Sequence, residues 1–396
     1  MADQKNQRST VSAGTPVSAP APAPTPAQAP APTPTPTPIR ACISLDAWRR
    51  NLALLRRAAP KSRLLAVIKA NAYGHGAIQA ARALEAADAF GVARLGEGVE
   101  LRQAGVTRPV VLMEGVFSDA ELALALQHEL DLVVHEPGQL QMLERAATAA
   151  GRVIWLKLDT GMSRLGFAPQ DAAAAAARLR ALPQLGDLRV MTHFACADEP
   201  GSPLTDRQRQ RFDAALAEIA RTGSRPMAGL ANSAAILDRP DTHGDWVRAG
   251  IALYGSSPFG GRSAASLGLE PVMTLGTRVI ALRDLQPGDT VGYGATWRAA
   301  RPTRLATIAA GYADGVPRHL PSGSPVLVDG RRVPLVGRVS MDMVTVDVTE
   351  HDDVHVGSEA ILWGRGLPVD EVAAAAGTIS YELLCGVTRR VAFEYL

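Results

Sequence analysis

Eight short apolar segments recur between residues 64 and 250, and alanine-rich stretches with a helical pattern separate them. Uninterrupted apolar segments of this length are typical of strands that are buried on both faces of a parallel sheet. Eight such strands that alternate with helices predict a parallel (β/α)8 barrel, which is an α/β fold. The expected strands are residues 64–69, 90–93, 109–113, 132–134, 153–158, 188–193, 227–232 and 246–250.

The pattern changes after about residue 270, where the helical period fades and β signals take over. Turn sequences occur at residues 287–289 (Pro-Gly-Asp) and 329–330 (Asp-Gly), and residues 344–348 alternate apolar with polar. These features predict a second, mainly antiparallel β domain. We therefore expect the barrel over residues 39–270 and the β domain over residues 271–396.

The first 38 residues have a different composition, with Ala-Pro and Thr-Pro repeats from Thr15 to Pro38. Proline cannot occupy the interior of a helix or sheet, so residues 1–38 are expected to form a disordered, extended tail. The prolines also interrupt every apolar core that a signal peptide would need. A solvated spacer is favoured over a polyproline segment that docks a partner.

Composition excludes several classes of protein. The 396 residues are 47% hydrophobic and 20% charged, which is enough to bury a large core. A net charge of +2, without a basic run that interleaves aromatics, argues against nucleic-acid binding, and no apolar stretch is long enough to span a membrane. Cys42, Cys196 and Cys385 lie too far apart to indicate a disulfide framework or a metal site, so a cytoplasmic protein without a bound metal is expected.

Lys69 ends the first expected strand and precedes a glycine-rich turn. A lysine amine, whose unperturbed pKa is about 10.4, becomes a useful nucleophile only where its surroundings favour the neutral form. The end of a buried strand supplies such surroundings, and Gly74 and Gly76 let the backbone approach a ligand closely. This segment alone leaves open a lysine that simply extends to water.

Other polar side chains occupy equivalent positions along the barrel. Barrel enzymes carry their chemistry at the C-terminal ends of the strands, and phosphate often binds to backbone N–H groups after the last strand. Gly250 and Ile251 follow the last expected strand. The polar residues at strand ends are Lys69, Lys157, His193, Asn232 with Ser233, and Arg248.

Residues 66–76, AVIKANAYGHG, resemble the pyridoxal-phosphate attachment signature of alanine racemases. Further motifs of that family follow in order, so the resemblance extends from about residue 39 to residue 396. It implies a barrel and a β domain that pair head to tail in a homodimer. The motifs are WLKLDTGMSRLGF (155–167), THF (192–194), ADE (197–199), ANS (231–233), VRAGIALYG (247–255), GYGAT (292–296), GYADG (311–315), VGRVSMD (336–342) and YELLC (381–385).

The resemblance implies interconversion of L-alanine and D-alanine, which supplies D-alanine for peptidoglycan. Pyridoxal 5'-phosphate would form a Schiff base with Lys69, and its electron sink makes the α-proton of an amino acid removable. Racemisation needs an acid/base on each face, because a single base returns its proton to the face it came from. By resemblance Lys69 serves D-alanine, and Tyr293 serves L-alanine in the partner subunit's pocket, so the sites are shared between the subunits.

The resemblance also assigns the groups around the cofactor. Arg248 would bond the pyridine nitrogen and keep it unprotonated, because arginine does not readily give up its proton. His193 would lie in a relay between Arg248 and the tyrosine base. The implied phosphate ligands are Tyr73, Ser233, Gly250, Ile251 and Tyr381.

Substrate contacts and supporting residues complete the implied site. Arg164 would contact the phenolic oxygen of the cofactor and the substrate carboxylate, and the backbone N–H of Met341 would bind that carboxylate too. Lys157 corresponds to a lysine that the family carries in carbamylated form to hold the arginine. The supporting residues are Lys157, Asn232, Tyr312, Arg318 and Asp342, of which Tyr312 and Arg318 are expected at the entrance.

Two departures and three alternatives stay open. Ala392 stands where the family often has proline, and Ser340 where it often has cysteine, so the detailed shape of the substrate pocket is in doubt. A broad-specificity racemase would lack the equivalent of Lys157. A barrel-type amino-acid decarboxylase would lack the Tyr293 motif, and a pyridoxal-phosphate carrier protein would resemble the barrel alone.

Overall fold

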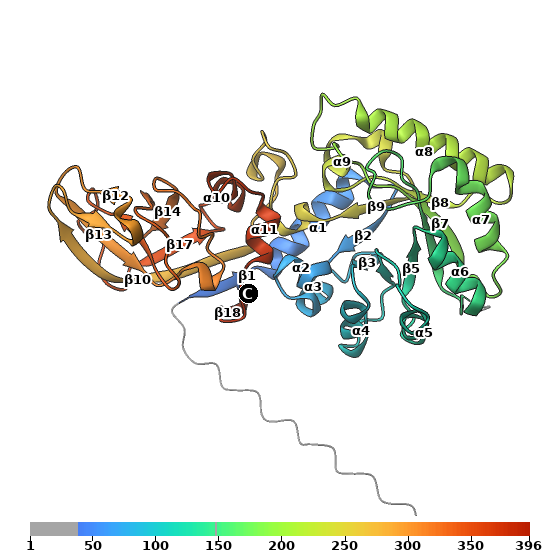
Figure 1. The fold of residues 1–396 in the computed structure, drawn as a ribbon, viewed down its shortest axis with the longest axis horizontal. Coiled ribbons are helices and arrows are strands. Elements are labelled where there is room, and N and C mark those ends of the chain that lie inside the picture. Colours follow the sequence, from blue (N-terminus) through green and yellow to red (C-terminus); the bar gives the residue numbers. More distant parts are fainter. Residues whose placement is uncertain (1–38, 147–148) are drawn as a thin grey trace, which may run out of the picture. The chain divides into compact units, whose positions relative to one another are not determined.

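The structure is a computed structural model that describes residues 39–146 and 149–396 (Figure 1). The expected tail, residues 1–38, lies outside the described residues. The described chain contains a closed parallel barrel and a mainly antiparallel sheet. Within it, no helix is long and apolar enough to cross a membrane.

Strands β2 to β9 close the barrel, and the predicted fold class is confirmed. All neighbouring strands pair in parallel, and β9 returns to β2 in a register that runs from Arg63 opposite Trp246 to Ala66 opposite Ala249. The eight strands are β2 (Arg63–Val67), β3 (Ala89–Val92), β4 (Val110–Leu112), β5 (Asp131–Val134), β6 (Val153–Lys157), β7 (Asp187–Met191), β8 (Met227–Gly229) and β9 (Trp246–Ala249).

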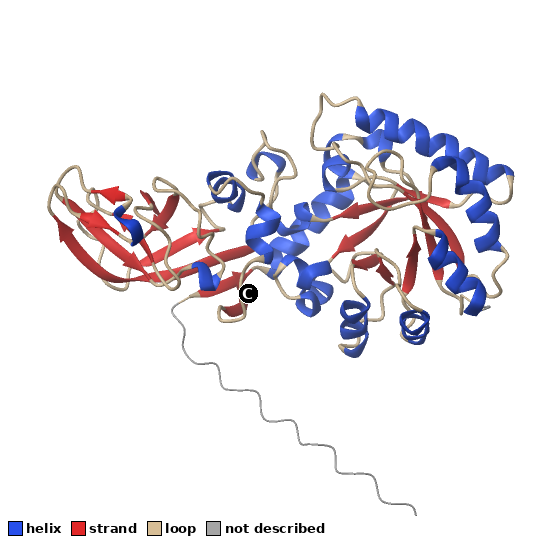
Figure 2. Cartoon of the chain, viewed as in Figure 1, coloured by secondary structure: helices blue, strands red, loops and turns tan. Residues whose placement is uncertain are grey.

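Helices surround these strands, as Figure 2 shows. The helix α8, over residues 204–221, illustrates why: it buries Phe212, Ala215, Leu216 and Ile219, whose spacing places them on one face. Ser44, Ser118 and Asn232 start three helices by accepting a hydrogen bond from the backbone. The helices are α1 (Leu45–Ala58), α3 (Ala77–Ala83), α4 (Leu95–Gln103), α5 (Asp119–Gln127), α6 (Pro137–Ala146), α7 (Ala172–Arg180), α8 (Leu204–Arg221) and α9 (Ser233–Asp238).

Large side chains fill the barrel interior. The rings of Trp155 and Trp246 pack edge to face with their centroids 5.4 Å apart. The guanidinium of Arg189 lies over both rings, at 5.1 and 4.6 Å from their centroids. The barrel interior is therefore a packed core rather than a pore. A binding site is expected at the C-terminal ends of the strands instead.

The β domain is built on an eight-stranded sheet that includes the long strand β10 (Met273–Leu285). Its hairpin between β14 (residues 325–328) and β15 (residues 331–334) turns at Asp329 and Gly330, both with positive φ, as an Asp-Gly turn requires. A separate two-stranded ribbon joins β11 (Thr290–Val291) to β12 (Trp297–Arg298). The other strands after β10 are β13 (Thr303–Ile308), β14 (Pro325–Val328), β15 (Arg331–Pro334), β16 (Val344–Asp347), β17 (Glu359–Trp363) and β18 (Ala392–Tyr395).

The first strand of the described chain, β1 (Arg40–Ile43), also belongs to this sheet. It pairs antiparallel with β10 and parallel with β18. Two helices, α10 (Val369–Ala375) and α11 (Ser380–Cys385), follow β17. The hydroxyl of Ser380 lies 2.6 Å from that of Ser256, which follows the barrel, so α11 is tied to the barrel's C-terminal side.

Candidate active site

The chain after β2 forms a left-handed turn, α2 (Lys69–Tyr73). Ala70, Asn71, Ala72 and Tyr73 have φ angles of 52°, 52°, 53° and 51°. Within it the N–H of Ala72 bonds the carbonyl of Ile68 at 2.8 Å. L-residues pay about 1–2 kcal/mol each for this conformation, so the surrounding structure must hold the turn in place.

The turn places Tyr73 in an aromatic cluster at the barrel mouth. Its ring stacks on Tyr254 with the centroids 4.4 Å apart and lies 5.7 Å from the ring of Tyr381 on α11. Desolvation by burial raises the pKa of Tyr73, and it raises the pKa of Tyr381 to about 12. Both phenols are therefore neutral near pH 7 and can donate a hydrogen bond. Lys69 itself is half-buried.

Hydroxyl groups and a backbone N–H meet after β9. Ser233 Oγ accepts a hydrogen bond from Gly250 N at 2.9 Å. A Cβ atom at Gly250 would lie only 2.9 Å from the Tyr73 hydroxyl, and 3.8 Å from Ser233 Oγ. Asn232 caps α9 through a 3.1 Å bond from Ala235 N, which fixes Ser233 at the first helical position. These groups suit a phosphate, and Ile251 follows at the start of η3 (Ile251–Tyr254).

Arg248 lies at the end of β9 and is only 3% exposed. Its Nη1 donates to the carbonyl of Gly229 at 2.8 Å, and its Nη2 donates to the carbonyls of Thr192 and Leu230. Burial lowers its pKa to about 10, so the guanidinium stays charged near pH 7. Three carbonyls fix its plane, and Nε takes no part in these bonds.

Lys157 and His193 lie beside this guanidinium. Burial, followed by the charges of Arg248 and Arg164, lowers the pKa of Lys157 to about 8. Burial and the charges of Arg248 and Lys157 lower the pKa of His193 to about 3, so its ring is neutral near pH 7. Lys69 contributes to both shifts. Cationic groups from three strand ends, those of β2, β6 and β9, thus converge beside the neutral ring of His193 and favour an anionic ligand.

Arg164 projects from the loop after β6. Asp159 Oδ1 accepts hydrogen bonds from the N–H groups of Gly161, Met162 and Ser163, each at 3.0 Å. Gly166, with φ of +133°, lets the loop close, because a Cβ there would lie 2.4 Å from Asp159 N. The loop is therefore rigid at its base, and it presents Arg164 as an exposed side chain.

Several of the predicted site residues in the β domain lie near one another. The N–H groups of Tyr312 and Ala313 bond the carbonyls of Ser340 and Met341, both at 3.0 Å. Asp342 is paired at 2.7 Å with Arg390. Arg318 lines a hollow of about 260 Å³ together with Tyr312.

Tyr293 stands on a turn of the β domain, η5 (Tyr293–Ala295), and is 68% exposed. Met341 is 52% exposed. The described chain therefore brings Tyr381 to the barrel mouth, while it leaves Tyr293 and Met341 open to solvent.

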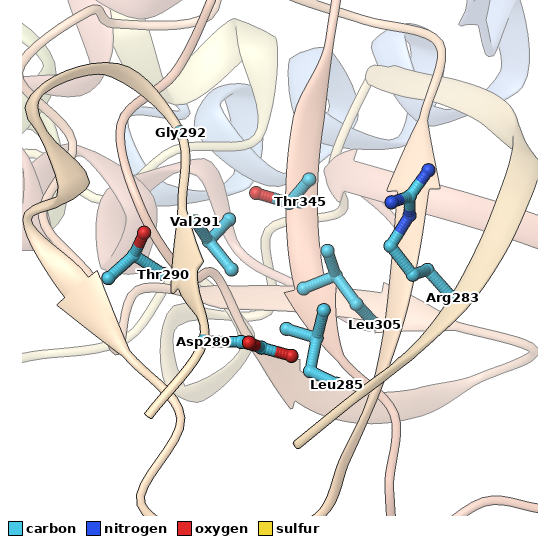
Figure 3. A pocket seen from close by; sticks show the side chains of 8 residues that line it. All are labelled: Arg283, Leu285, Asp289, Thr290, Val291, Gly292, Leu305 and Thr345. Atoms are coloured by element: carbon cyan, nitrogen blue, oxygen red, sulfur yellow. The ribbon is translucent and has the colours of Figure 1, made fainter. Parts of the chain in front are cut away.

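A second hollow, of about 510 Å³, lies in the β domain (Figure 3). It is lined by Arg283, Leu285, Asp289, Thr290, Val291, Gly292, Leu305 and Thr345, none of which is a predicted site residue. Among residues 39–146 and 149–396, no cluster of three or more side chains that could hold a metal ion occurs.

The sequence did not single out Tyr254, His75 or Glu97. Tyr254 donates a 2.8 Å hydrogen bond to the carbonyl of Val67 and supports the ring of Tyr73. His75 and Glu97 bond the backbone of the left-handed turn. His75 belongs to the motif at residues 66–76, which was a usable signal, whereas nothing in the sequence marks Glu97.

Comparisons with known proteins identify the family of this chain. The family described as "Alanine racemase, N-terminal domain" matches residues 43–258, and "Alanine racemase, C-terminal domain" matches residues 272–395. The chain is 51% identical over 354 residues to an alanine racemase of Nitrosospira multiformis, covering 89% of this chain and 98% of the relative. It is 53% identical over 360 residues to one of Thioalkalivibrio sulfidiphilus, covering 90% and 98%.

Solved structures give the same result. The biosynthetic alanine racemase of Pseudomonas aeruginosa superposes with a TM-score of 0.87 at 48% identity, covering 91% of this chain and 99% of that one. The alanine racemase of Acinetobacter baumannii superposes with a TM-score of 0.85 at 39% identity, covering 90% and 99%. Both domains, in sequence and in fold, are matched over nearly their full length, and the chain belongs to the alanine racemase family.

Proposed function

We propose that this protein interconverts L-alanine and D-alanine with pyridoxal 5'-phosphate held at Lys69, and that D-alanine made in this way serves peptidoglycan synthesis. The observation that carries the proposal is the convergence of Lys69, Tyr73, Ser233 and Arg248 at the C-terminal end of one barrel. About 50% identity to alanine racemases over some nine-tenths of the chain supports the choice of reaction.

The residues fit the cofactor at its phosphate end. The close approach of Gly250 to the Tyr73 hydroxyl leaves no room for a side chain, and Ser233 Oγ and backbone N–H groups border the same space. Tyr73 and Tyr381 are neutral donors there. Ile251 and Gly250 supply backbone N–H groups, that of Gly250 while it also donates to Ser233 Oγ. This donor set suits a phosphate that carries two negative charges.

The opposite end of the cofactor would face Arg248. Because the guanidinium keeps its proton, it can only donate, so an aromatic nitrogen that accepts from it stays unprotonated. The cofactor, when bound, supplies an electron sink for the pair left on the substrate's α-carbon. An unprotonated pyridine nitrogen would weaken this electron sink. A weaker sink favours return of a proton to the α-carbon over side reactions.

Two residues move the substrate's proton. Lys69 Nζ, once free, takes or gives it on one face of the α-carbon, and the Tyr293 hydroxyl does so on the other face. His193, neutral beside Arg248, links the guanidinium to the tyrosine base. By family resemblance Tyr293 acts in the partner subunit of a homodimer, and its 68% exposure in a single chain leaves it accessible to another subunit. Each site is thus shared between two subunits.

The substrate carboxylate meets Arg164 and the backbone N–H of Met341. Lys157 carries a carbamate that pairs with Arg164, and the lowering of its pKa to about 8 supports this, because it raises the fraction of neutral amine, the form that adds to carbon dioxide. Asn232 holds Ser233 through the helix cap. Tyr312, Arg318 and Asp342 come from the β domain and line the entrance to the partner's site, and the hollow that Tyr312 and Arg318 share supports this.

The proposal extends to the domain boundaries and to the cellular compartment. The barrel, predicted over residues 39–270, carries the cofactor, and the β domain, predicted over residues 271–396, completes the partner's site; residues 40–43 lie in the sheet of the β domain although they precede the barrel. The matched domain families, residues 43–258 and 272–395, support this division. All three cysteines are free, which supports a reducing cytoplasm.

Chiral analysis of alanine, after incubation of the purified protein with L-alanine and pyridoxal phosphate, tests the proposal. D-alanine that approaches an equal mixture is the expected result. If L-alanine stays unchanged while Lys69 takes up the cofactor, the assignment to Lys69 and Tyr293 fails. A broad-specificity racemase would turn over large amino acids as fast as alanine, a decarboxylase would release carbon dioxide, and a carrier protein would release only the cofactor.

A further inference from the structure

Glu97, on α4, connects two neighbouring strand ends through a single carboxylate. Its Oε1 accepts a 2.6 Å hydrogen bond from the N–H of Ala70, the residue after Lys69. Its Oε2 accepts from the N–H groups of Ala93 and Arg94, which follow β3, at 2.7 and 3.0 Å. The first N–H of the left-handed turn is therefore anchored to the adjacent strand through a charged acceptor.

His75 bonds the other end of the same turn. Its Nδ1 lies 3.1 Å from the carbonyl of Ala72 and 2.8 Å from that of Tyr73, so Nδ1 carries the proton and donates. The ring is fully buried, 4.9 Å from the ring of Tyr254 and 5.7 Å from that of Trp48. Burial lowers its pKa to about 4, which keeps it a neutral, single donor near pH 7.

We propose that Glu97 and His75 are positioning residues that hold the left-handed turn from its two ends, so that Lys69 and Tyr73 meet the same cofactor. The inference rests on the proposed function, and it adds two residues that act on the site through the backbone. Four successive L-residues with positive φ relax towards other conformations unless their surroundings prevent it. Relaxation would change the relative placement of Lys69 and Tyr73, because they are the first and last residues of the turn.

The bonding of Glu97 makes a sharp substitution possible. Both carboxylate oxygens accept, one from Ala70 and the other from Ala93 and Arg94. Glu97→Gln keeps the size of the side chain but replaces one acceptor with an NH2 donor, which must then face an N–H group. Glu100→Gln is the matched control, because Glu100 lies on the same helix with its side chain exposed.

Two measurements on the purified proteins separate this inference from the proposed function. Hydrogen–deuterium exchange of the cofactor-free protein reports on residues 69–76 without any reaction. Titration with pyridoxal phosphate, followed by absorbance, then gives the affinity at Lys69, and borohydride reduction with mass analysis verifies the attachment point. We expect faster exchange in residues 69–76 and an affinity about tenfold lower or more in Glu97→Gln, as for loss of one bond to a charged acceptor. Glu100→Gln should match the parent protein in both.

Unchanged exchange in Glu97→Gln would overturn the inference, and so would faster exchange with unchanged cofactor affinity. Failure of the parent protein to take pyridoxal phosphate at Lys69 would overturn the proposed function instead. His75 gives an independent check, since His75→Asn retains an N–H donor near the position of Nδ1 and His75→Ala does not. Higher cofactor affinity in His75→Asn than in His75→Ala supports the positioning role, and equal affinities contradict it.

Discussion

The ring of Tyr381, carried by a helix that follows the last-but-one strand of the β domain, lies 5.7 Å from the ring of Tyr73 in the turn after the first barrel strand. The close approach of α11 depends on Gly74, because a Cβ there would lie 2.2 Å from the carbonyl oxygen of Leu384. The two domains of one chain therefore build the phosphate end of the proposed site together.

Loss of the proposed Schiff-base lysine should remove both cofactor attachment and racemisation. We expect Lys69→Arg to lower the rate of D-alanine formation by a factor of about 10²–10⁴ or more, because a positioned acid/base usually contributes a factor in that range. Chiral analysis gives the rate, and borohydride reduction with mass analysis gives the attachment. Lys61→Arg, at an exposed lysine, should behave like the parent protein. Attachment that persists in Lys69→Arg would move the site to another lysine.

Shared sites make a prediction about mixed subunits. Lys69→Ala and Tyr293→Phe proteins should each be inactive as homodimers, because each site lacks one of its two bases. After the two are unfolded and refolded together, a heterodimer has one site with both bases intact, so about a quarter of the parent activity should return at equal proportions. No recovery despite heterodimer formation would show that Tyr293 serves its own subunit's site.

A methyl group at Gly250 should weaken cofactor binding. In Gly250→Ala the new Cβ meets the Tyr73 hydroxyl at 2.9 Å, so Tyr73 must move away from the phosphate position. Affinity for pyridoxal phosphate should fall about tenfold or more, as for other overpacked sites. Gly260→Ala is the matched control, since nothing lies within 4 Å of a Cβ at Gly260. Equal affinities in the two variants would remove Gly250 from the phosphate site.

Two depressed histidine pKa values predict loss of stability in mild acid. The pKa of His75 falls from 6.5 to about 4, and that of His193 from 6.5 to about 3, with burial as the largest cause in each case. Below pH 6.5 the unfolded chain binds protons that the folded chain does not, so the free energy of unfolding falls as pH decreases through this range. The slope should reach at most about 1.4 kcal/mol per pH unit for each histidine.

Urea unfolding at pH 7 and at pH 5 measures this effect. His193→Gln should reduce the difference between the two pH values, whereas His319→Gln, at an exposed histidine, should leave it unchanged. A free energy of unfolding that is the same at both pH values would contradict the burial of these rings as neutral groups.

The parts of the fold that depend on local pattern could be predicted. The barrel strands carry their signal in their own residues, and the structure places strands within or beside all eight expected segments. The pairing of β1 with β10 and β18 could not be predicted, because register between segments more than 200 residues apart leaves no local trace. The helices α10 and α11 were hidden by the general β character of residues 271–396.

The candidate site divides in a similar way. Lys69, Ser233 and Arg248 could be found because they are polar residues at the ends of apolar strands. The left-handed turn could not, because Ala70, Ala72 and Tyr73 have no intrinsic preference for positive φ. Glu97 acts through backbone N–H groups, which every sequence contains, so its partners are visible only in three dimensions.

The parallel pairing of β1 with β18 also sets an order of events during synthesis. Residues 40–43 leave the ribosome long before residues 392–395, their parallel partners, do. The barrel, which lies between them in the sequence, can close first. Until β18 is made, the edge of β1 that pairs with it is exposed and can associate with other chains. A translation product that stops shortly before residue 392 would keep that edge permanently exposed, even with every residue of the barrel in place.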